Sequence, residues 1–361
     1  MYISINIKFL QERTNYPMTS IREIARKAGV SPATVSRVLN RDKTFSIKDS
    51  TRQKVLNLAK SLHYELKPNR PSNGPKRKII VLCALSVETL NRDLYFSDIK
   101  KGLYKEADIS HITVVNFIHF PDSQFRFSDL KKVDGVIVIG TFTSNFLEHI
   151  SKYNTNVVII NEPRDFEKFD LIRNNYYSYT NKILDLLFKR NFYKIALIGG
   201  AVNQMDCLGL SEESCIDPRS RAYRNWMKSH DLPIQEIATD WTLEAGFNAM
   251  EKLLSMKNTP EIVIASSDLL AVGAYRAIHL HQLKIPDDIQ LISFNNSEVA
   301  SYLVPSLSSI SAPTLEMGEA AIRLLNDRFI NQRTQAWQVV LPSKFIERES
   351  SYSKFNDSYL S

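Results

Sequence analysis

Apolar and polar residues follow different periods in different parts of this chain. From residue 79 onward, short apolar runs typical of buried strands alternate with stretches in which apolar residues recur at the spacing of one helix face. Strands that alternate with helices in this way predict doubly wound parallel sheets. The segment 79–350 is long enough to favour two such sheets over one. The predicted strands are 78–85, 111–118, 134–140, 156–161, 194–200, 262–267, 288–295 and 337–341, and the predicted helices are 96–108, 177–190, 221–230, 242–255 and 268–280.

The N-terminal part carries three shorter helical patterns. Ser20 can cap the first helix, with a glutamate at the capping-box position after it, and Gly29 stands where a helix commonly ends. Ser31 as N-cap and Pro32 at the first helical position begin the second helix. A third amphipathic stretch covers about 48–63. Two short helices joined by a glycine turn predict a helix-turn-helix, and the third helix completes a small core.

The second helix of such a motif enters the major groove with its first residues facing the base edges. Here Pro32 and Ala33 offer apolar surface to a thymine methyl group, and Arg37, one turn later, can pair with guanine O6 and N7. Short polar side chains nearby suit phosphate contacts, which position the protein without reading sequence. The predicted DNA-contacting residues are Ser20, Arg22, Ser31, Pro32, Ala33, Thr34, Ser36, Arg37, Asn40 and Arg70.

The formal charge is divided unevenly along the chain. Residues 1–78 hold 17 Lys and Arg against 5 Asp and Glu, a net charge of +12, whereas the rest holds 29 against 34, a net charge of −5. A basic module attached to a larger, mildly acidic domain is the pattern expected of a nucleic-acid-binding protein. A solvated basic tail is the alternative, but this segment is not of low complexity.

The run IREIARKAGVSPATVSRVLN, followed by TRQKVLNLAKSLHYE, resembles the headpiece of the LacI/GalR (lactose-repressor/galactose-repressor) family of bacterial transcription regulators. The segments KKVDGVIVIG, KIALIGG, SSDLLAVGAYRAIHLHQLKIPDDIQLISFNN and FIERES extend the resemblance along nearly the whole chain. It implies a homodimeric repressor that binds a pseudo-palindromic operator in double-stranded DNA. It also implies an all-α helix-turn-helix headpiece and a periplasmic-binding-protein-like core of two doubly wound parallel-sheet lobes.

Two segments depart from the family pattern. Relatives carry a hinge helix with a leucine that wedges into the minor groove, but residues 67–78 read KPNRPSNGPKRK, and this density of proline and glycine argues against a helix. Phosphate contacts from Arg70 and Lys76 can replace part of that binding. Residues 1–17 have no counterpart, and Met18 stands where relatives begin, so these residues are either an untranslated extension or an additional arm.

These observations predict a division of the chain into five parts. The last part has no leucine heptads, which favours a dimer over a tetramer. The parts are an N-terminal extension (1–17), the helix-turn-helix domain (18–66), a basic linker (67–78), an effector-binding domain (79–350) and a tail (351–361). Within the effector-binding domain, we expect lobe 1 at about 79–174 and 312–334 and lobe 2 at about 175–311 and 335–350.

Ligands of doubly wound sheets bind beyond the carboxyl ends of the strands, so polar residues that follow strands are candidates for effector contacts. Asp, Asn, Ser and Arg hydrogen-bond sugar hydroxyls, and an indole stacks on a sugar face. Two alternatives stay open, because Trp241 can be core packing and Asp268 can serve a helix N-terminus. The resemblance adds Tyr95 and Phe96 at the mouth of the cleft. The predicted effector residues are Ser86, Tyr95, Phe96, Asn161, Arg219, Trp241, Ser267, Asp268 and Asn295.

Other classes of protein are disfavoured by what the sequence lacks. It has no phosphate-binding loop and no nucleophile elbow, so we expect no enzyme and no catalytic residue. Its three cysteines and seven histidines show no metal-ligand spacing, so we expect no metal and no cofactor in a reduced, cytoplasmic protein. No apolar run is long enough for a membrane span, and no export signal is visible. A regulator that answers to a phosphosugar, a purine or a partner protein stays open, as does a free-standing sugar-binding protein.

Overall fold

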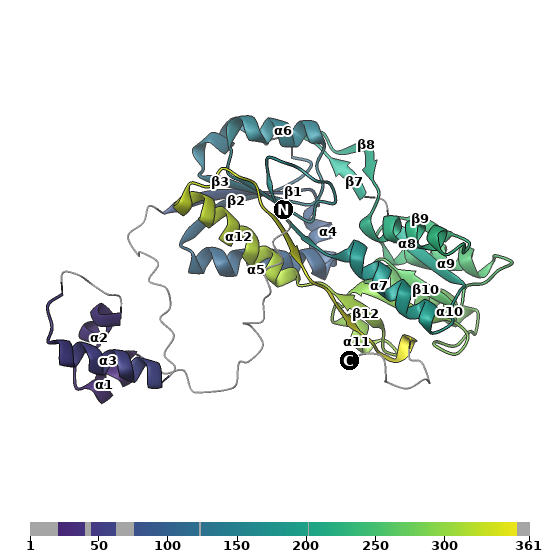
Figure 1. The fold of residues 1–361 in the computed structure, drawn as a ribbon. Helices are drawn as coiled ribbons and strands as arrows, with labels where there is room; N and C mark the ends of the chain where they lie inside the picture. Colours follow the sequence, from purple (N-terminus) through teal and green to yellow (C-terminus); the bar gives the residue numbers. More distant parts are fainter. Residues whose placement is uncertain (1–20, 40–44, 63–75, 123, 201, 352–361) are drawn as a thin grey trace. The chain divides into compact units, whose positions relative to one another are not determined.

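The chain forms two compact units, Met1–Pro75 and Lys76–Ser361, which are described separately (Figure 1). The predicted extension 1–17, most of the predicted linker and nearly all of the tail lie outside the described residues. The computed structural model describes residues 21–39, 45–62, 76–122, 124–200 and 202–351.

Three short helices make up the described part of the first unit. Ile24, Val35 and Val55, one from each helix, are fully buried and meet in a single small core. Gly29, at φ +73°, makes the left-handed turn between the first two helices, a conformation in which other residues are strained. The structure therefore contains the helix-turn-helix predicted from the sequence. Its helices are α1 (Ile21–Ala28), α2 (Pro32–Leu39) and α3 (Asp49–Ser61).

Two six-stranded sheets form the larger unit, and we call the parts that contain them lobe 1 and lobe 2. The strand order is β13-β5-β4-β3-β1-β2 in lobe 1 and β14-β12-β11-β10-β6-β9 in lobe 2. All pairs are parallel except β12 with β14. The predicted fold class is thus confirmed. The strands are β1 (Arg77–Cys83), β2 (Ile112–His119), β3 (Gly135–Ile139), β4 (Val157–Ile160), β5 (Asp170–Asn174), β6 (Ile195–Gly200), β9 (Gln235–Thr239), β10 (Ile262–Ala265), β11 (Gln290–Asn295), β12 (Ser308–Ser311), β13 (Gln338–Leu341) and β14 (Lys344–Ile346).

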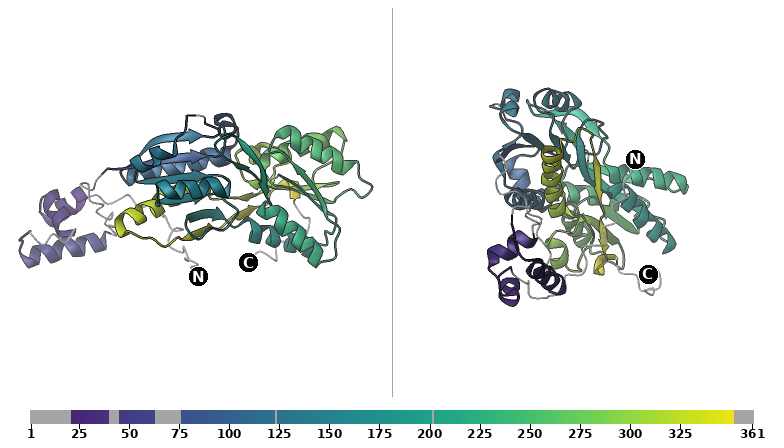
Figure 2. Two further views of the ribbon diagram at one scale, coloured as in Figure 1. Left: turned by 90° about the horizontal axis from the view of Figure 1, so that it is seen from above. Right: turned by 60° about the vertical axis from the view of Figure 1, so that its left-hand side comes forward.

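Helices cover the sheets of both lobes (Figure 2). The central strands β3 and β4 are fully buried runs of glycine, valine and isoleucine, as expected where helices lie on both faces of a parallel sheet. In lobe 1, α5 packs closely against α12, because Gly102 leaves room for the backbone of Leu315. The helices are α4 (Val87–Arg92), α5 (Leu94–Ile109), α6 (Ser144–Tyr153), α7 (Tyr176–Lys189), α8 (Pro218–Ser229), α9 (Leu243–Leu254), α10 (Asp268–Leu280), α11 (Val299–Tyr302) and α12 (Thr314–Asn331), with short 3-10 helices η1 (Phe127–Lys132) and η2 (Glu349–Ser351).

The C-terminal segment passes from lobe 1 to lobe 2 later than the sequence suggested. We expected residues 335–350 in lobe 2, but β13 pairs in parallel with β5 of lobe 1, and only β14 reaches the lobe 2 sheet. That part of the division is therefore wrong, because the edge of the lobe 1 sheet is completed by a strand from near the end of the chain. The predictions also missed β5, β9, β12, β14 and a two-stranded hairpin, β7 (Val202–Met205) with β8 (Leu210–Cys215).

A buried carboxylate ties the late segments to lobe 1. Asp170, at the start of β5, is fully buried and accepts hydrogen bonds from Arg328, Arg333 and the backbone N–H of Trp337. Although burial alone would raise the pKa of Asp170, the two guanidinium groups hold it below its usual value. This network fixes α12 and β13 against β5.

The cysteines are not joined to one another. Cys83 is buried at the end of β1, where burial raises the pKa of its thiol to about 11, and Cys207 and Cys215 are half-buried in the hairpin. Among the described residues, no three histidine, cysteine or acidic side chains gather as metal ligands would. No helix in the described part of the chain is long and apolar enough to cross a membrane.

Candidate DNA-binding helices and effector site

Helix α2 has one buried face and one exposed face. Val35 and Val38 are buried in the small core, whereas Pro32, Ala33 and Arg37 are exposed to solvent. The three residues expected to face base edges are therefore all available on the surface of the helix. The Arg37 guanidinium lies 5.2 Å from the centre of the Phe45 ring, a cation–π distance that restricts where this side chain points.

The polar residues at the start of α2 serve the helix itself. Ser31 Oγ accepts a hydrogen bond from the backbone N–H of Thr34 at 3.1 Å, and the two hydroxyl groups are 2.9 Å apart. Ser31 is thus the N-cap expected from the sequence, and Ser36 is half-buried on the same helix. The other predicted DNA contacts, Ser20, Asn40, Arg70 and the side chain of Arg22, lie outside the described residues.

On the lobe 1 side of the candidate effector site, Tyr95 organises two asparagines. Its hydroxyl donates a hydrogen bond to Asn161 Oδ1 at 3.0 Å and accepts one from Asn174 Nδ2 at 3.0 Å. Asn161 follows β4 at φ +63°, a left-handed conformation that asparagine tolerates better than most residues. Phe96 packs edge-on against Tyr95, with ring centres 4.9 Å apart, and is half-buried. Tyr95, Phe96 and Asn161 are therefore close together, although 66 positions separate Tyr95 from Asn161.

On the lobe 2 side, Arg219 is held by a carboxylate and by aromatic rings. Asp217 caps α8 and accepts from Arg219 Nε at 2.7 Å and from Nη2 at 2.6 Å, and Nη1 donates to the Ser266 carbonyl at 2.6 Å. The guanidinium lies 4.6 Å from the ring centre of Tyr176 and 5.0 Å from that of Trp241. Burial alone would lower the pKa of Arg219, but the Asp217 charge outweighs it and raises the pKa.

Tyr176 connects the two sets of residues. It begins α7, immediately after β5 of lobe 1, and its backbone N–H donates to Asn174 Oδ1 at 3.3 Å. Its hydroxyl donates to Asn295 Oδ1 at 2.9 Å, at the end of β11 in lobe 2. A chain of hydrogen bonds thus runs from Asn161 through Tyr95, Asn174 and Tyr176 to Asn295, from one lobe to the other.

Asp268 is buried and already has hydrogen-bond partners. Its two carboxylate oxygens accept from the hydroxyls of Ser293, Ser297 and Ser309 and from the backbone N–H of Ser297. Burial raises its pKa although these donors oppose the shift. Because about four acceptor sites of a carboxylate are then used, Asp268 is better placed to hold the loop after β11 than to bind a ligand.

Trp241 lies beside Arg219, and its indole occupies the place that a side chain at Gly200 would need. A Cβ atom on Gly200 would come within 2.1 Å of the indole, so only glycine allows this approach. Trp241 is partly exposed and also packs against the lobe 2 core. The two predicted serines act as helix N-caps: Ser86 accepts from Thr89 N at 3.1 Å and Ser267 from Leu270 N at 3.3 Å.

Sequence reasoning missed Asp93, Asn174, Tyr176 and Asp217. Asp93 caps α5 by accepting a hydrogen bond from the backbone N–H of Tyr95. Its pKa is raised, because burial and the Asp268 charge outweigh the opposing effect of Arg219. The pKa of this lobe 1 carboxylate therefore depends on charged groups of lobe 2. Asp217 could have been found, since an aspartate before a proline predicts a helix start. Asn174 ends β5, which had not been recognised as a strand, and Tyr176 lies two residues after it.

Burial differs among the residues of the site: Phe96, Asn161, Trp241 and Asn295 are half-buried, and Ser86 is exposed. Tyr95 is 6% exposed, Arg219 8% and Asp268 2%. The charges of Arg219 and Asp268 in lobe 2 act on Asp93 in lobe 1, so the two lobes meet at this site. The arrangement brings together amide, hydroxyl and carboxylate acceptors, guanidinium donors and an indole, which suits recognition of a polyhydroxylated ligand by hydrogen bonds and stacking.

Comparisons with known proteins agree with this geometry. A family described as bacterial regulatory proteins, lacI family, matches residues 20–69, and a periplasmic binding protein-like domain matches residues 184–351. The transcriptional repressor MelR of Bacillus subtilis is 34% identical over 340 residues, which are 92% of this chain and 97% of that protein. The chain belongs to the lacI family of bacterial regulatory proteins. The predicted family and its class of function, DNA-binding transcription regulation, are thus confirmed.

Solved structures of lacI-family proteins share this fold. The lac repressor dimer bound to operator and the anti-inducer ONPF is similar with a TM-score of 0.64 and 21% identity, covering 93% of this chain and 100% of that one. The transcriptional regulator CelR in complex with cellobiose is similar with a TM-score of 0.63 and 21% identity, covering 92% and 99%. At this identity the likeness establishes the architecture of headpiece and two-lobed core.

Proposed function

We propose that this protein is a transcriptional repressor that binds its operator as a homodimer and is released when a neutral sugar binds between the lobes. The observation that carries the sugar-binding part is the setting of Arg219, a guanidinium held flat by Asp217 and bordered by the indole of Trp241. After three N–H donors are used by Asp217 and Ser266, two remain for a ligand. Donors beside an aromatic face suit a sugar ring.

The charges of the site favour an uncharged ligand. Asp217 balances Arg219 within the same pair, and Asp93 and Asp268 add negative charge. A phosphate or carboxylate would need a cation that is not already compensated, because a buried unpaired anion is costly. We therefore favour a neutral sugar over a phosphosugar.

The relatives support the same reading. The solved complex of CelR contains cellobiose, and the lac repressor structure holds operator and an anti-inducer, so proteins of this fold bind DNA and a small ligand together. The exposed residues Pro32, Ala33 and Arg37 of α2 would read the base edges in each half-site. As a regulator of this kind the protein would act in the cytoplasm, where the DNA is, and would not be an enzyme.

Operator release tests this function. Fluorescence anisotropy of a labelled promoter fragment from beside the gene, at fixed salt, would be measured against galactose, ribose, lactose, cellobiose and glucose 6-phosphate. We expect tight binding in the absence of sugar and release by a neutral sugar only. Release by glucose 6-phosphate alone would contradict the neutral-ligand argument, and binding that no sugar affects would contradict a sugar effector.

Arg219→Ala and a matched control variant distinguish a role of Arg219 in effector binding from a role in folding. Arg219→Ala should bind the promoter fragment as well as the unchanged protein does and lose the response to sugar. Arg224→Ala removes an arginine from the same helix that pairs with Glu236 and does not contact the site, so it should keep the response. If Arg219→Ala lost DNA binding as well, Arg219 would be structural.

A further inference from the structure

The β7–β8 hairpin belongs to lobe 2 by sequence but is attached to lobe 1. Along the chain, the hairpin lies between β6 and α8, which are both elements of lobe 2. In Figure 1 it lies between α6 of lobe 1 and β9 and α8 of lobe 2. Its second strand ends two residues before Asp217, which holds Arg219 in the effector site. The hairpin is thus a direct connection between that site and the other lobe.

Backbone hydrogen bonds attach the hairpin to the segment that follows β3. The N–H of Met205 donates to the carbonyl of Thr141 at 3.0 Å, and the N–H of Thr143 donates to the carbonyl of Met205 at 2.9 Å. Together they form a parallel β-bridge between Phe142 and Met205. The Met205 side chain is 5% exposed and is part of the lobe 1 core, where it packs with residues such as Phe142 and Phe146.

A half-buried arginine, Arg164, reinforces this attachment. Arg164 Nη1 donates to Gln204 Oε1 of β7 at 2.7 Å, and Nη2 donates to the carbonyl of Phe142. Arg164 is paired with Glu162, which is 1% exposed, by hydrogen bonds of 2.8 and 2.9 Å. Glu162 directly follows Asn161 of the effector site, so the lobe 1 end of the attachment is adjacent in sequence to an effector residue.

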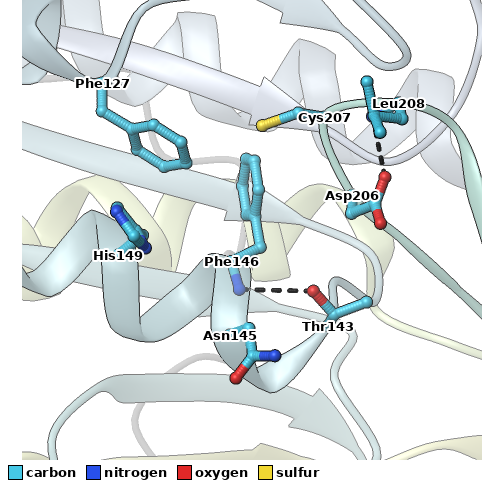
Figure 3. Close-up of a pocket in the computed structure, with 8 residues that line it drawn as sticks. All are labelled: Phe127, Thr143, Asn145, Phe146, His149, Asp206, Cys207 and Leu208. Atoms are coloured by element: carbon cyan, nitrogen blue, oxygen red, sulfur yellow. Dashed lines mark hydrogen bonds between the residues drawn. The ribbon is translucent and has the colours of Figure 1, made fainter.

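The turn of the hairpin contributes less to the attachment to lobe 1 than the first strand does. Between the turn and lobe 1 lies a pocket of about 370 Å³, walled by Phe127 and Phe146 on one side and by Cys207 and Leu208 on the other (Figure 3). Leu208 is 95% exposed. The attachment therefore rests on Gln204 and Met205, and the exposed turn offers a control position.

We propose that the β7–β8 hairpin is an interlobe clasp, which stabilises the closed effector domain by docking Gln204 and Met205 on lobe 1. The clasp adds to the proposed sugar response, on which this inference rests, because only the closed form surrounds the ligand. None of Arg164, Gln204 and Met205 is among the effector contacts described above. Releasing the clasp lowers the closed fraction, and the apparent affinity for sugar falls in proportion.

A measurement without sugar tests the clasp independently. In full-length protein with Trp226→Phe and Trp337→Phe, Trp241, beside Arg219, is the remaining tryptophan. Acrylamide quenching of its fluorescence reports how open the lobes are. We expect quenching to rise about twofold in Met205→Ser and to stay unchanged in Leu208→Ala. Met205→Leu keeps an apolar anchor of similar size and should restore the low quenching.

Sugar titration gives the second readout. With the sugar that releases the promoter fragment, Met205→Ser should bind about tenfold more weakly, since it loses a buried anchor, and Gln204→Ala a few-fold more weakly. Promoter binding without sugar should be no weaker than that of the unchanged protein, because the variant disfavours the sugar-binding closed form that releases the operator. The Gln204→Ala variant keeps the Met205 anchor, so it stays informative if Met205→Ser folds poorly.

The possible failures are distinguishable. If no sugar releases even the unchanged protein, the proposed function fails, whereas the quenching experiment still decides whether the hairpin holds the lobes together. If quenching and sugar affinity are unaffected in Met205→Ser and Gln204→Ala, while the exchange of the Met205 and Thr143 amide protons shows the hairpin undocked, the clasp proposal is overturned.

Discussion

The hydroxyl of Tyr176 donates a hydrogen bond to Asn295 Oδ1 at 2.9 Å, across 119 positions of the chain. Tyr176 lies two residues after β5 of the lobe 1 sheet, and Asn295 ends β11 of the lobe 2 sheet. The same ring lies over the Arg219 guanidinium. One side chain at a crossing between the lobes therefore touches both the interlobe hydrogen-bond chain and the cation expected to bind effector.

Tyr176→Phe removes this hydrogen bond and keeps the ring beside Arg219. We expect sugar to bind about fivefold more weakly, because one hydrogen bond is worth about 1 kcal/mol, while promoter binding without sugar is unchanged. Isothermal titration with the releasing sugar measures the loss. Tyr275→Phe, which removes a hydrogen bond to the Pro305 carbonyl elsewhere in lobe 2, is the matched control and should leave sugar affinity intact. Equal losses in both variants would contradict the assigned role.

Arg37→Ala should relax operator specificity. An arginine bidentate to guanine contributes about 1–3 kcal/mol of discrimination, so affinity for the correct site should fall towards that for a mismatched site. Lys76→Ala should instead weaken all sequences alike and reduce the salt slope by about one. Anisotropy on matched and mismatched fragments over a salt series separates the two. Identical effects of the two variants on specificity would refute this division between base and phosphate contacts.

Asp170→Asn should destabilise the protein strongly. It leaves Arg328 buried without its countercharge, and breaking a buried pair by removing one partner costs about 3–5 kcal/mol. Urea unfolding measures the loss, and Asp129→Asn, which removes an exposed pair with Lys132, should cost no more than about 1 kcal/mol. Because the folded pKa of Asp170 lies below its unfolded value, its stabilising effect is present above the unfolded pKa and is lost as pH falls through the folded one.

Sugar binding should weaken as the pH falls through the raised pKa of Asp93. Burial and the nearby Asp268 raise the pKa of Asp93. An exposed aspartate has a pKa of about 3.9. Asp93 therefore takes up a proton at a higher pH than an exposed aspartate does. The protonated group is a poorer acceptor for sugar hydroxyls, so affinity should fall as pH decreases through the raised pKa and stay constant above it. Because the pKa of Asp93 is raised in the folded state, its proton uptake favours folding, so the titration of Asp93 itself does not unfold the protein. Asp93→Asn should flatten the profile, and an unchanged profile would exclude Asp93 from binding.

The local sequence pattern was enough to predict those helices and strands whose signals lie close together in the sequence. The Ser31-Pro32 start, the Gly29 turn and the apolar spacing of α2 predict a helix-turn-helix because caps and periodicity are local effects. The apolar runs of β1, β3, β4, β6 and β10 predict a parallel sheet because strands covered on both faces must be apolar throughout. Polar residues at the ends of predicted strands identified Asn161 and Asn295 as candidates, whereas Arg219 was added for its chemistry and by the family resemblance.

Other features depend on contacts between distant segments. The sequence of β5 is DLIRN, and its two charged residues do not fit the apolar pattern of a buried strand. The strand can be buried because Arg328 and Arg333, more than 150 positions later, neutralise Asp170. The lobe in which β13 lies is decided by which sheet edge is free. The attachment of Met205 to lobe 1 has no periodic signal, since a two-stranded hairpin with a polar sequence is stable only where a partner covers it. Sequence thus specified the elements and their chemistry, whereas tertiary packing decided which side chains meet, because such pairing depends on the closure of long loops and not on neighbouring residues.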